Sequence, residues 1–190
     1  NEMLIKNKVL GIALTVLVCN NVLFSQIRIG LDISGKFKGS AYGDFETFDA
    51  DKGIVIGYDH LLQNQDKMQL GVGGEFMVSR GIEEFPTGKA AFHSFYAYGK
   101  YALDKTIYAY GRLGYNIHTG DGVYQNWGSV TLRGGMMYSF GGGYAITPTI
   151  SLEGLFSSHS GDVSDDSGYS ADTIKLTYTR FSIGIRYTLQ

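Results

Sequence analysis

Apolar and polar residues alternate at period two along most of this 190-residue chain, in eight stretches separated by turn-rich segments. This period is typical of a β-strand with one apolar and one polar face. In the C-terminal stretch, Phe181, Ile183, Ile185, Tyr187 and Leu189 alternate with Ser182, Gly184, Arg186 and Thr188. The pattern predicts strands over residues 27–36, 51–62, 68–79, 91–103, 107–118, 130–146, 150–159 and 172–190.

The connections between these strands alternate in length. Short turns are predicted at 63–67, 104–106 and 147–149, and longer segments rich in Gly, Asp and Ser cover 37–50, 80–90, 119–129 and 160–171. Short turns at one end and long loops at the other are typical of outer-membrane barrels, whose long loops lie outside the cell. Eight strands of about ten residues are enough to close a small barrel.

The supply of charge decides which face of the strands points outward. A water-facing exterior is about 25–35% charged, whereas the polar faces of these strands carry about one charge each, as expected for a narrow interior. An interior just wide enough for side chains also argues against a large pore. Because unpaired buried charges are costly, we predict a paired polar network in the lumen. Its members are Arg28, Asp32, Asp59, Glu75, Lys100, Arg112, Arg133, Glu153 and Arg186.

Two details refine the apolar face. Tyr101, Tyr144 and Tyr187 fall beside short turns or the C-terminus, where the aromatic girdle of a membrane barrel is expected. In the last strand, Ile174, Leu176 and Tyr178 have the opposite parity to Phe181 and Ile183. This change of parity predicts either a β-bulge near 179–180 or an upper half of the strand that stands clear of the membrane.

The N-terminal segment has the pattern of a secretory signal peptide. Basic Lys6 and Lys8 precede an apolar run over 9–18, and Ser25 supplies a small residue before a cleavage site. We therefore predict a signal peptide over 1–26 and one domain over 27–190. The only cysteine, Cys19, falls in the predicted leader, so the mature chain is expected to contain no disulfide.

With these features, the chain resembles the small eight-stranded OmpA/OmpX-type outer-membrane barrels along its whole mature length. Ser182, Gly184, Tyr187 and Leu189 are similar in spacing to the C-terminal signal by which the barrel-assembly machinery recognises its clients, although that signal usually ends on an aromatic residue. The resemblance implies an all-β fold, an eight-stranded antiparallel up-and-down transmembrane β-barrel in the bacterial outer membrane. It further implies an envelope structural or surface-interaction role.

The partners expected from this resemblance are outer-membrane lipid, lipopolysaccharide, the assembly machinery and an extracellular ligand held by the loops. We expect a monomer with no cofactor and no metal. The net charge of −2 gives no indication of a nucleic-acid partner. The acidic segment 162–168 lacks the glycine and glutamate that an EF-hand requires at its sixth and twelfth positions, so a solvated loop is expected there.

One cluster suggests catalysis. Ser157 and His159 lie on the same strand face as Glu153, and lipid A deacylases are barrels of this size that use a serine, a histidine and an acidic residue. The spacing around His159 departs from that family's motif, and a serine-rich strand end explains the same residues. We expect no enzymatic activity. Two alternatives remain open, a lipid A-modifying hydrolase and a narrow channel or small-ligand-binding barrel.

Overall fold

The computed structural model describes residues 25–41, 44–82, 85–121, 130–165 and 173–189, so most of the predicted signal peptide, up to residue 24, lies outside the described residues. Every element formed by these described residues is a strand. They are β1 (Ser25–Ala41), β2 (Asp44–Asp49), β3 (Gly53–Gln65), β4 (Met68–Met77), β5 (Arg80–Ile82), β6 (Phe85–Ala102), β7 (Ile107–Asp121), β8 (Val130–Ala145), β9 (Ile150–Asp165) and β10 (Thr173–Thr188). Among these residues no helix is long and apolar enough to cross a membrane.

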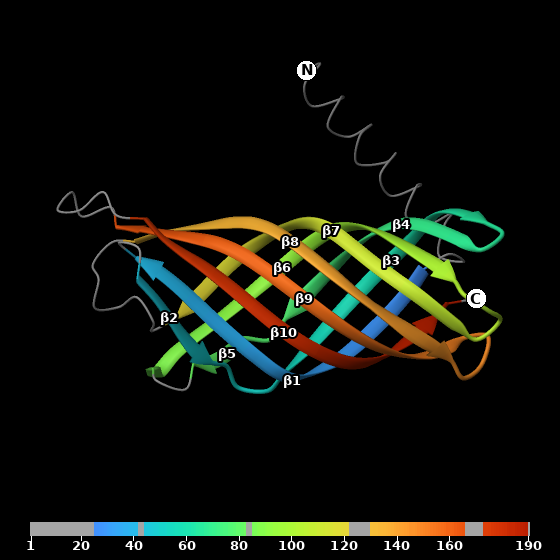
Figure 1. The fold of residues 1–190 in the computed structure, drawn as a ribbon, viewed down its shortest axis with the longest axis horizontal. Coiled ribbons are helices and arrows are strands. Elements are labelled where there is room, and N and C mark those ends of the chain that lie inside the picture. The colour runs from blue at the N-terminus through green and yellow to red at the C-terminus, as the bar shows by residue number, and fades with distance from the viewer. Residues whose placement is uncertain (1–24, 42–43, 83–84, 122–129, 166–172, 190) are drawn as a thin grey trace, which may run out of the picture.

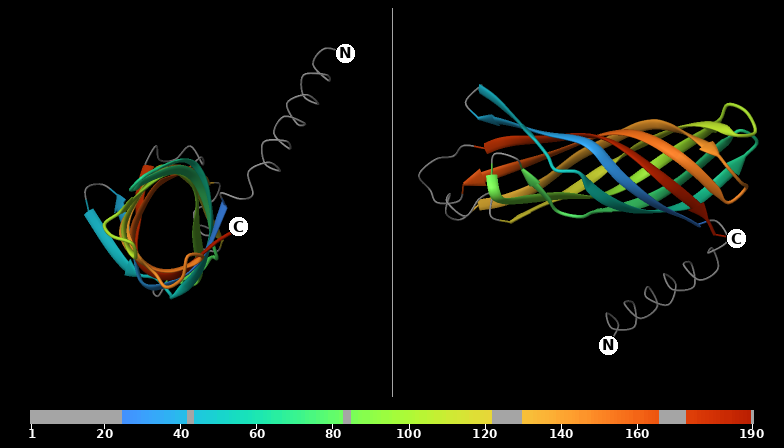
Figure 2. Two further views of the ribbon diagram at one scale, coloured as in Figure 1. Left: turned by 90° about the vertical axis from the view of Figure 1, so that its right-hand side faces the viewer. Right: turned by 90° about the horizontal axis from the view of Figure 1, so that it is seen from below.

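Eight of the strands form a closed antiparallel ring. Neighbouring strands follow the order β1, β3, β4, β6, β7, β8, β9 and β10, and β10 pairs back to β1 from Gln26 opposite Thr188 to Ser40 opposite Lys175. Figure 1 shows these strands winding around one long axis, and the end-on view of Figure 2 shows the closed ring. The predicted eight-stranded up-and-down barrel is confirmed.

The two ends of the barrel differ as predicted. The tight turns β3–β4, β6–β7 and β8–β9 lie at the same end as the start of β1 and the end of β10 (Figure 1), which we call the periplasmic end. In the first turn Asp66 has a φ of 39°, a left-handed conformation that aspartate tolerates better than most residues. In the second, Asp104 accepts bonds from the backbone of Thr106 at 2.6 Å and Ile107 at 2.7 Å.

The opposite, outer end carries structure that the sequence pattern does not predict. β1, β6, β7 and β9 extend into segments expected to be loops, and β2 and β5 form there as additional strands. β2 pairs with the last part of β1 and leans away from the ring in Figure 2, while β5 pairs with β6. In this part of β1 the outward positions hold Lys36 and Lys38 in place of apolar residues. The backbone is still extended, but the alternation that predicts a strand is absent.

The apolar faces point outward, as the charge argument predicts. Large apolar side chains on every strand of the ring are exposed, among them Ile29, Leu113 and Phe140. The predicted girdle residues are about half exposed near the periplasmic end, with Tyr101 at 49%, Tyr144 at 53% and Tyr187 at 48%. Such an exterior is suited to lipid and unsuited to water.

A register shift occurs on a different strand from the one for which a bulge is predicted. The bulge expected near 179–180 is wrong: β10 pairs with β9 without a break, and Tyr178, Arg180 and Ser182 all point inward. The register shift lies instead in β1, between Asp32 and Ser34. Tyr178 breaks the apolar alternation because it belongs to the interior.

Candidate functional site

The interior of the barrel contains a buried network of charged side chains. Of the nine residues predicted to line the lumen, seven are buried: Arg28, Asp32, Asp59, Glu75, Arg112, Glu153 and Arg186. Lys100 is partly buried, and its ammonium lies 3.8 Å from the centre of the Tyr108 ring.

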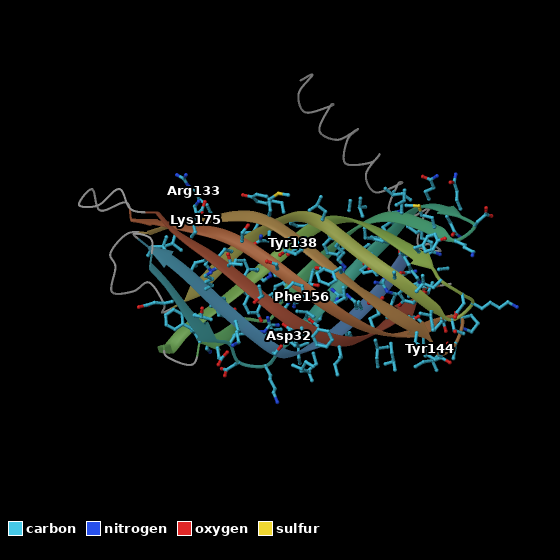
Figure 3. The ribbon with its side chains drawn as sticks, viewed as in Figure 1. Asp32, Arg133, Tyr138, Tyr144, Phe156 and Lys175 are labelled. Atoms are coloured by element: carbon cyan, nitrogen blue, oxygen red, sulfur yellow. The ribbon has the colours of Figure 1, made fainter. Side chains whose placement is uncertain are left out.

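Arg133 is the exception, because its side chain is exposed on the outside of the barrel (Figure 3). A register shift in β8 between Gly134 and Met137 places one additional residue there. Since a shift of one residue exchanges the two faces of a strand, Arg133 points outward while Ser139, beyond the bulge, points inward. The prediction that Arg133 lies in the lumen is therefore wrong.

Glu75 on β4 is the centre of the network. Its carboxylate forms ion pairs with Arg28 of β1, Arg180 of β10 and Arg112 of β7, the last at 3.0 Å. These strands are distributed around the ring, so their side chains meet across the lumen. A buried carboxylate is tolerated when its lone pairs are satisfied in this way.

Asp32 extends the network toward the outer end. It pairs with Arg80 at 2.6 Å and with Arg180 at 3.0 Å, and Ser182 donates a hydrogen bond to it at 2.5 Å. Because Arg180 binds both Asp32 and Glu75, the two carboxylates belong to one continuous network.

Asp59 and Glu153 form the part of the network nearer the periplasmic end. Arg186 bridges them, at 2.6 Å to each carboxylate. Three tyrosine hydroxyls supply further hydrogen-bond donors to these two carboxylates. Tyr96 and Tyr110 each donate to Asp59 at 2.8 Å, and Tyr108 donates to Glu153 at 2.7 Å.

Aromatic rings pack against these charged groups, and glycines make room for the rings. The Arg112 guanidinium lies 4.7 Å from the ring centres of both Tyr96 and Tyr110, a distance at which cation–π attraction operates. Glycines on β4 face the tyrosines of β6. A Cβ atom on Gly73 would lie 2.6 Å from the Tyr96 ring, and one on Gly71 would lie 2.5 Å from the Tyr98 ring. Large side chains fill the lumen because small residues face them.

An aromatic layer lies above the ions toward the outer end. The Phe92 ring stacks on His118 at 4.5 Å between centroids, and Phe37 stacks on Tyr178 at the same distance. His159 packs against Phe92 at 5.8 Å. Arg80 donates to the Tyr178 hydroxyl at 2.9 Å and so joins this layer to the ion network.

The sequence interpretation missed two members of the network, Arg80 and Arg180. Arg80 falls in the segment 80–90 that is predicted to be a loop, whereas it belongs to β5. Arg180 falls where a bulge is one of the two explanations for the change of parity. It has the same parity as Ser182 and Arg186, so extending that alternation backward would have found it. The alternating tyrosines on the polar faces of β6 and β7 were also a usable signal for the hydroxyl donors.

The candidate catalytic residues Ser157, His159 and Glu153 all point inward from β9 but have separate partners. Ser157 accepts a hydrogen bond from Ser139 at 2.9 Å, and Nδ1 of His159 lies 3.3 Å from the Ser94 hydroxyl. Glu153 is bound by Arg186. Six residues of extended strand separate Glu153 from His159, about 20 Å, so the three side chains do not form a hydrogen-bonded triad.

The residues of the C-terminal motif divide between the two faces of β10 and its end. Ser182 points inward to Asp32, and Gly184 packs where a Cβ atom would lie 2.7 Å from the Ile29 carbonyl oxygen. Tyr187 is exposed, and the Leu189 amide donates to the Ser25 carbonyl at 2.9 Å. Recognition of this motif by the assembly machinery stays a prediction.

The charges of the described interior do not cancel. Five arginines face four carboxylates, and Lys100 adds a further positive charge near the periplasmic end. Among the described residues no group of three or more histidines, cysteines and carboxylates is arranged to hold a metal ion. The network is therefore a cationic, hydrogen-bonded filling of the lumen.

Solved structures provide the comparison with known proteins, since no protein-family model and no curated protein matches the chain. Neisserial surface protein A is 14% identical, with a TM-score of 0.52, and the match covers 86% of this chain and 96% of that one. This chain has the fold of a small eight-stranded outer-membrane β-barrel.

Two further structures match the barrel. They are Ail, the attachment invasion locus protein of Yersinia pestis, and the outer membrane protein OprG from Pseudomonas aeruginosa. Ail is 17% identical over 86% of this chain and 97% of its own, with a TM-score of 0.49. OprG is 14% identical over 86% and 94%, with a TM-score of 0.44. At these identities the likeness concerns the fold and leaves the role of the barrel to be argued from its own residues.

Proposed function

We propose that the protein is a non-conducting, non-enzymatic outer-membrane barrel that presents its outer tier of strands to the surroundings of the cell. The observation that carries this proposal is the filled lumen. Glu75 is bound at once by arginines from three other strands of the ring, and the aromatic layer of Phe92 and His118 lies above it. A continuous water-filled path would have to break buried ion pairs, which is energetically costly.

The second support is the tier formed by β2, β5 and the ends of β1 and β6. β2 stands at the end of the strand order and pairs along one edge with β1. Directly after β2, Ala50 forms a bridge to Ile82 of β5. An edge strand of this kind offers backbone groups to a partner. Glu46, Thr47 and Asp49 are exposed on β2. These features suit a surface-interaction role.

Cysteine labelling tests this topology, because the only cysteine of the chain is Cys19, within the predicted leader. Thr47→Cys, on β2, should react with a membrane-impermeant maleimide on intact cells. Lys105→Cys, in a turn at the opposite end, is the matched control and should react only after the outer membrane is permeabilised. The unsubstituted chain measures the background. The reverse labelling pattern would contradict the proposed orientation, and equal labelling of both positions in intact cells would contradict a membrane-spanning barrel.

Planar bilayers test the filled lumen. The purified protein should give no stable unitary current steps under conditions in which a porin, used as positive control, conducts. Reproducible steps of constant size would support the narrow-channel alternative.

Unchanged lipid A mass spectra on expression are expected from the non-enzymatic role. A mass change that His159→Ala abolishes would support the hydrolase instead.

A further inference from the structure

A small pocket lies at the periplasmic end of the barrel, where the β3–β4 turn meets the β6–β7 turn. We call it the mouth pocket, and the left view of Figure 2 looks at the barrel from this end. Its volume is about 150 Å³, and its charged lining residues are Asp66, Lys67, Lys100, Asp104 and Lys105. Because a molecule of liquid water occupies about 30 Å³, the mouth pocket has room for an ion of about five heavy atoms.

The mouth pocket belongs to the interior side of the barrel wall. Lys100 and Ala145 line it, and each follows or precedes an exposed girdle residue, Tyr101 or Tyr144, that points the other way. Tyr108, a further lining residue, is buried in the lumen. Since successive side chains of a strand point to opposite faces, the wall of the barrel separates the mouth pocket from the surrounding lipid. The mouth pocket is therefore reached from the periplasm.

Lys100 is the most buried of the three lysines and has no carboxylate partner. Its ammonium lies 3.8 Å from the centre of the Tyr108 ring, and no ion pair joins it to a carboxylate among the described residues. The carboxylates of this part of the lumen, Asp59 and Glu153, are each bound by Arg186 at 2.6 Å. The face of an aromatic ring attracts a cation but does not neutralise it. Lys100 therefore brings an uncompensated positive charge to the mouth pocket.

The charges on the turns do not supply the missing counter-charge. Lys67 and Lys105 are exposed there together with Asp66 and Asp104, so the two lysines and the two aspartates balance formally. Asp104 accepts hydrogen bonds from the Thr106 amide at 2.6 Å and from the Thr106 hydroxyl at 3.0 Å. This carboxylate is thus held by its own turn. Within the described part of the chain, neither Lys67 nor Lys105 forms an ion pair.

We propose that the mouth pocket binds a small inorganic oxyanion from the periplasm, seated against the Lys100 ammonium. Inorganic phosphate is the simplest ion of this class. Its oxygens accept several hydrogen bonds, so it can be bound by Lys100 and by lysines of both turns at once. It would supply the counter-charge that Lys100 lacks. Because the ion network of Arg186 lies behind Tyr108, the anion binds and leaves on the periplasmic side.

Isothermal titration calorimetry of the purified full chain in a phosphate-free detergent tests the proposal. Inorganic phosphate is added at constant ionic strength, and the unsubstituted protein should bind one ion per chain. Lys100→Gln should bind about 10- to 100-fold more weakly, as expected for the loss of one charge-assisted hydrogen bond. The matched control is Lys89→Gln, the same change at an exposed position near the other end of β6. It should bind as the unsubstituted protein does.

A second variant distinguishes a shaped site from general attraction by the positive charge of the barrel. Ala145→Leu keeps every charge and fills the mouth pocket, so it should abolish binding. Full affinity in Ala145→Leu would show long-range attraction only and would overturn the proposal. Equal affinity of Lys100→Gln and the unsubstituted protein, or equal loss in Lys89→Gln, would also overturn it.

Each variant is first checked for the heat-modifiable gel migration of a folded barrel. If Lys100→Gln does not fold, Lys105→Gln takes its place, with a smaller expected loss because this lysine is exposed. Absence of saturable phosphate binding by the folded, unsubstituted protein would refute the mouth pocket as an anion site. That result would leave the proposed surface role unaffected, because the two ends of the barrel are separate.

Discussion

Removal of the charge of Glu75 is the most direct test of the ion network. Glu75→Gln keeps the shape of the side chain but leaves Arg28 and Arg112 with no carboxylate partner among the described residues, while Arg180 keeps Asp32. Breaking a buried ion pair by removing one partner costs about 3–5 kcal/mol. Because two guanidinium groups lose their partner here, we expect the free energy of unfolding to fall by about 5 kcal/mol, the upper part of that range.

Glu153→Gln is the matched control for this variant. Arg186 bridges Glu153 and Asp59, so it keeps a carboxylate at 2.6 Å when Glu153 is neutralised. The substitution weakens charged hydrogen bonds without leaving an unpaired charge, and a loss of about 1–3 kcal/mol is expected. The same chemical change on the same lumen surface should therefore have two clearly different effects.

Urea titration of the protein in lipid vesicles measures both variants, with the folded fraction followed by far-UV circular dichroism and by the migration of unheated samples on gels. The double variant Glu75→Gln/Arg112→Gln should regain part of the stability lost by Glu75→Gln alone, because it removes one of the unpaired cations. A loss for Glu75→Gln no greater than that for Glu153→Gln would refute the view that the network is organised around Glu75.

Three further outcomes are expected. Gly73→Val should lower the unfolding free energy by about 1–3 kcal/mol through overpacking against Tyr96. The control Gly74→Val, at a position that faces lipid, should be tolerated. Equal urea midpoints for the two variants would contradict this prediction. Leu113→Arg places a charge on the lipid face and should lower the free energy of unfolding in vesicles by about 2–4 kcal/mol. The same urea titration measures this loss, and an unchanged midpoint would place this face away from lipid. Backbone amides of the β6–β7 turn hold the pKa of Asp104 below its usual value. The contribution of Asp104 to turn stability is therefore present above the unfolded-state pKa and is lost as pH falls through the folded pKa. Amide exchange in this turn should quicken in that acidic range, and in Asp104→Asn it should be fast at every pH.

The tertiary structure corrects the sequence interpretation at the bulges and at the outer end. A period-two pattern assigns each residue to a face only while the register is continuous. One additional residue in β8 reversed the assignment of Arg133, and the change of parity near Arg180 arose from an aromatic residue that belongs inside. At the outer end the exterior is no longer lipid-facing, so the alternation disappears while β2 and β5 still form.

By itself, the sequence determined the fold class, the division into lipid-facing and lumen-facing positions, and most of the buried charges. It could do so because a membrane barrel requires strict alternation over its apolar band, and because sparse charge on the polar face is compatible only with a narrow interior. The pairing inside the lumen was decided by the tertiary structure alone. Arg180 reaches both Asp32 and Glu75, and Arg28 reaches Glu75, only after closure of the ring brings β10 and β1 together and places β4 across from them. Distances across a closed ring depend on strand tilt and register, which a pattern along one strand does not contain.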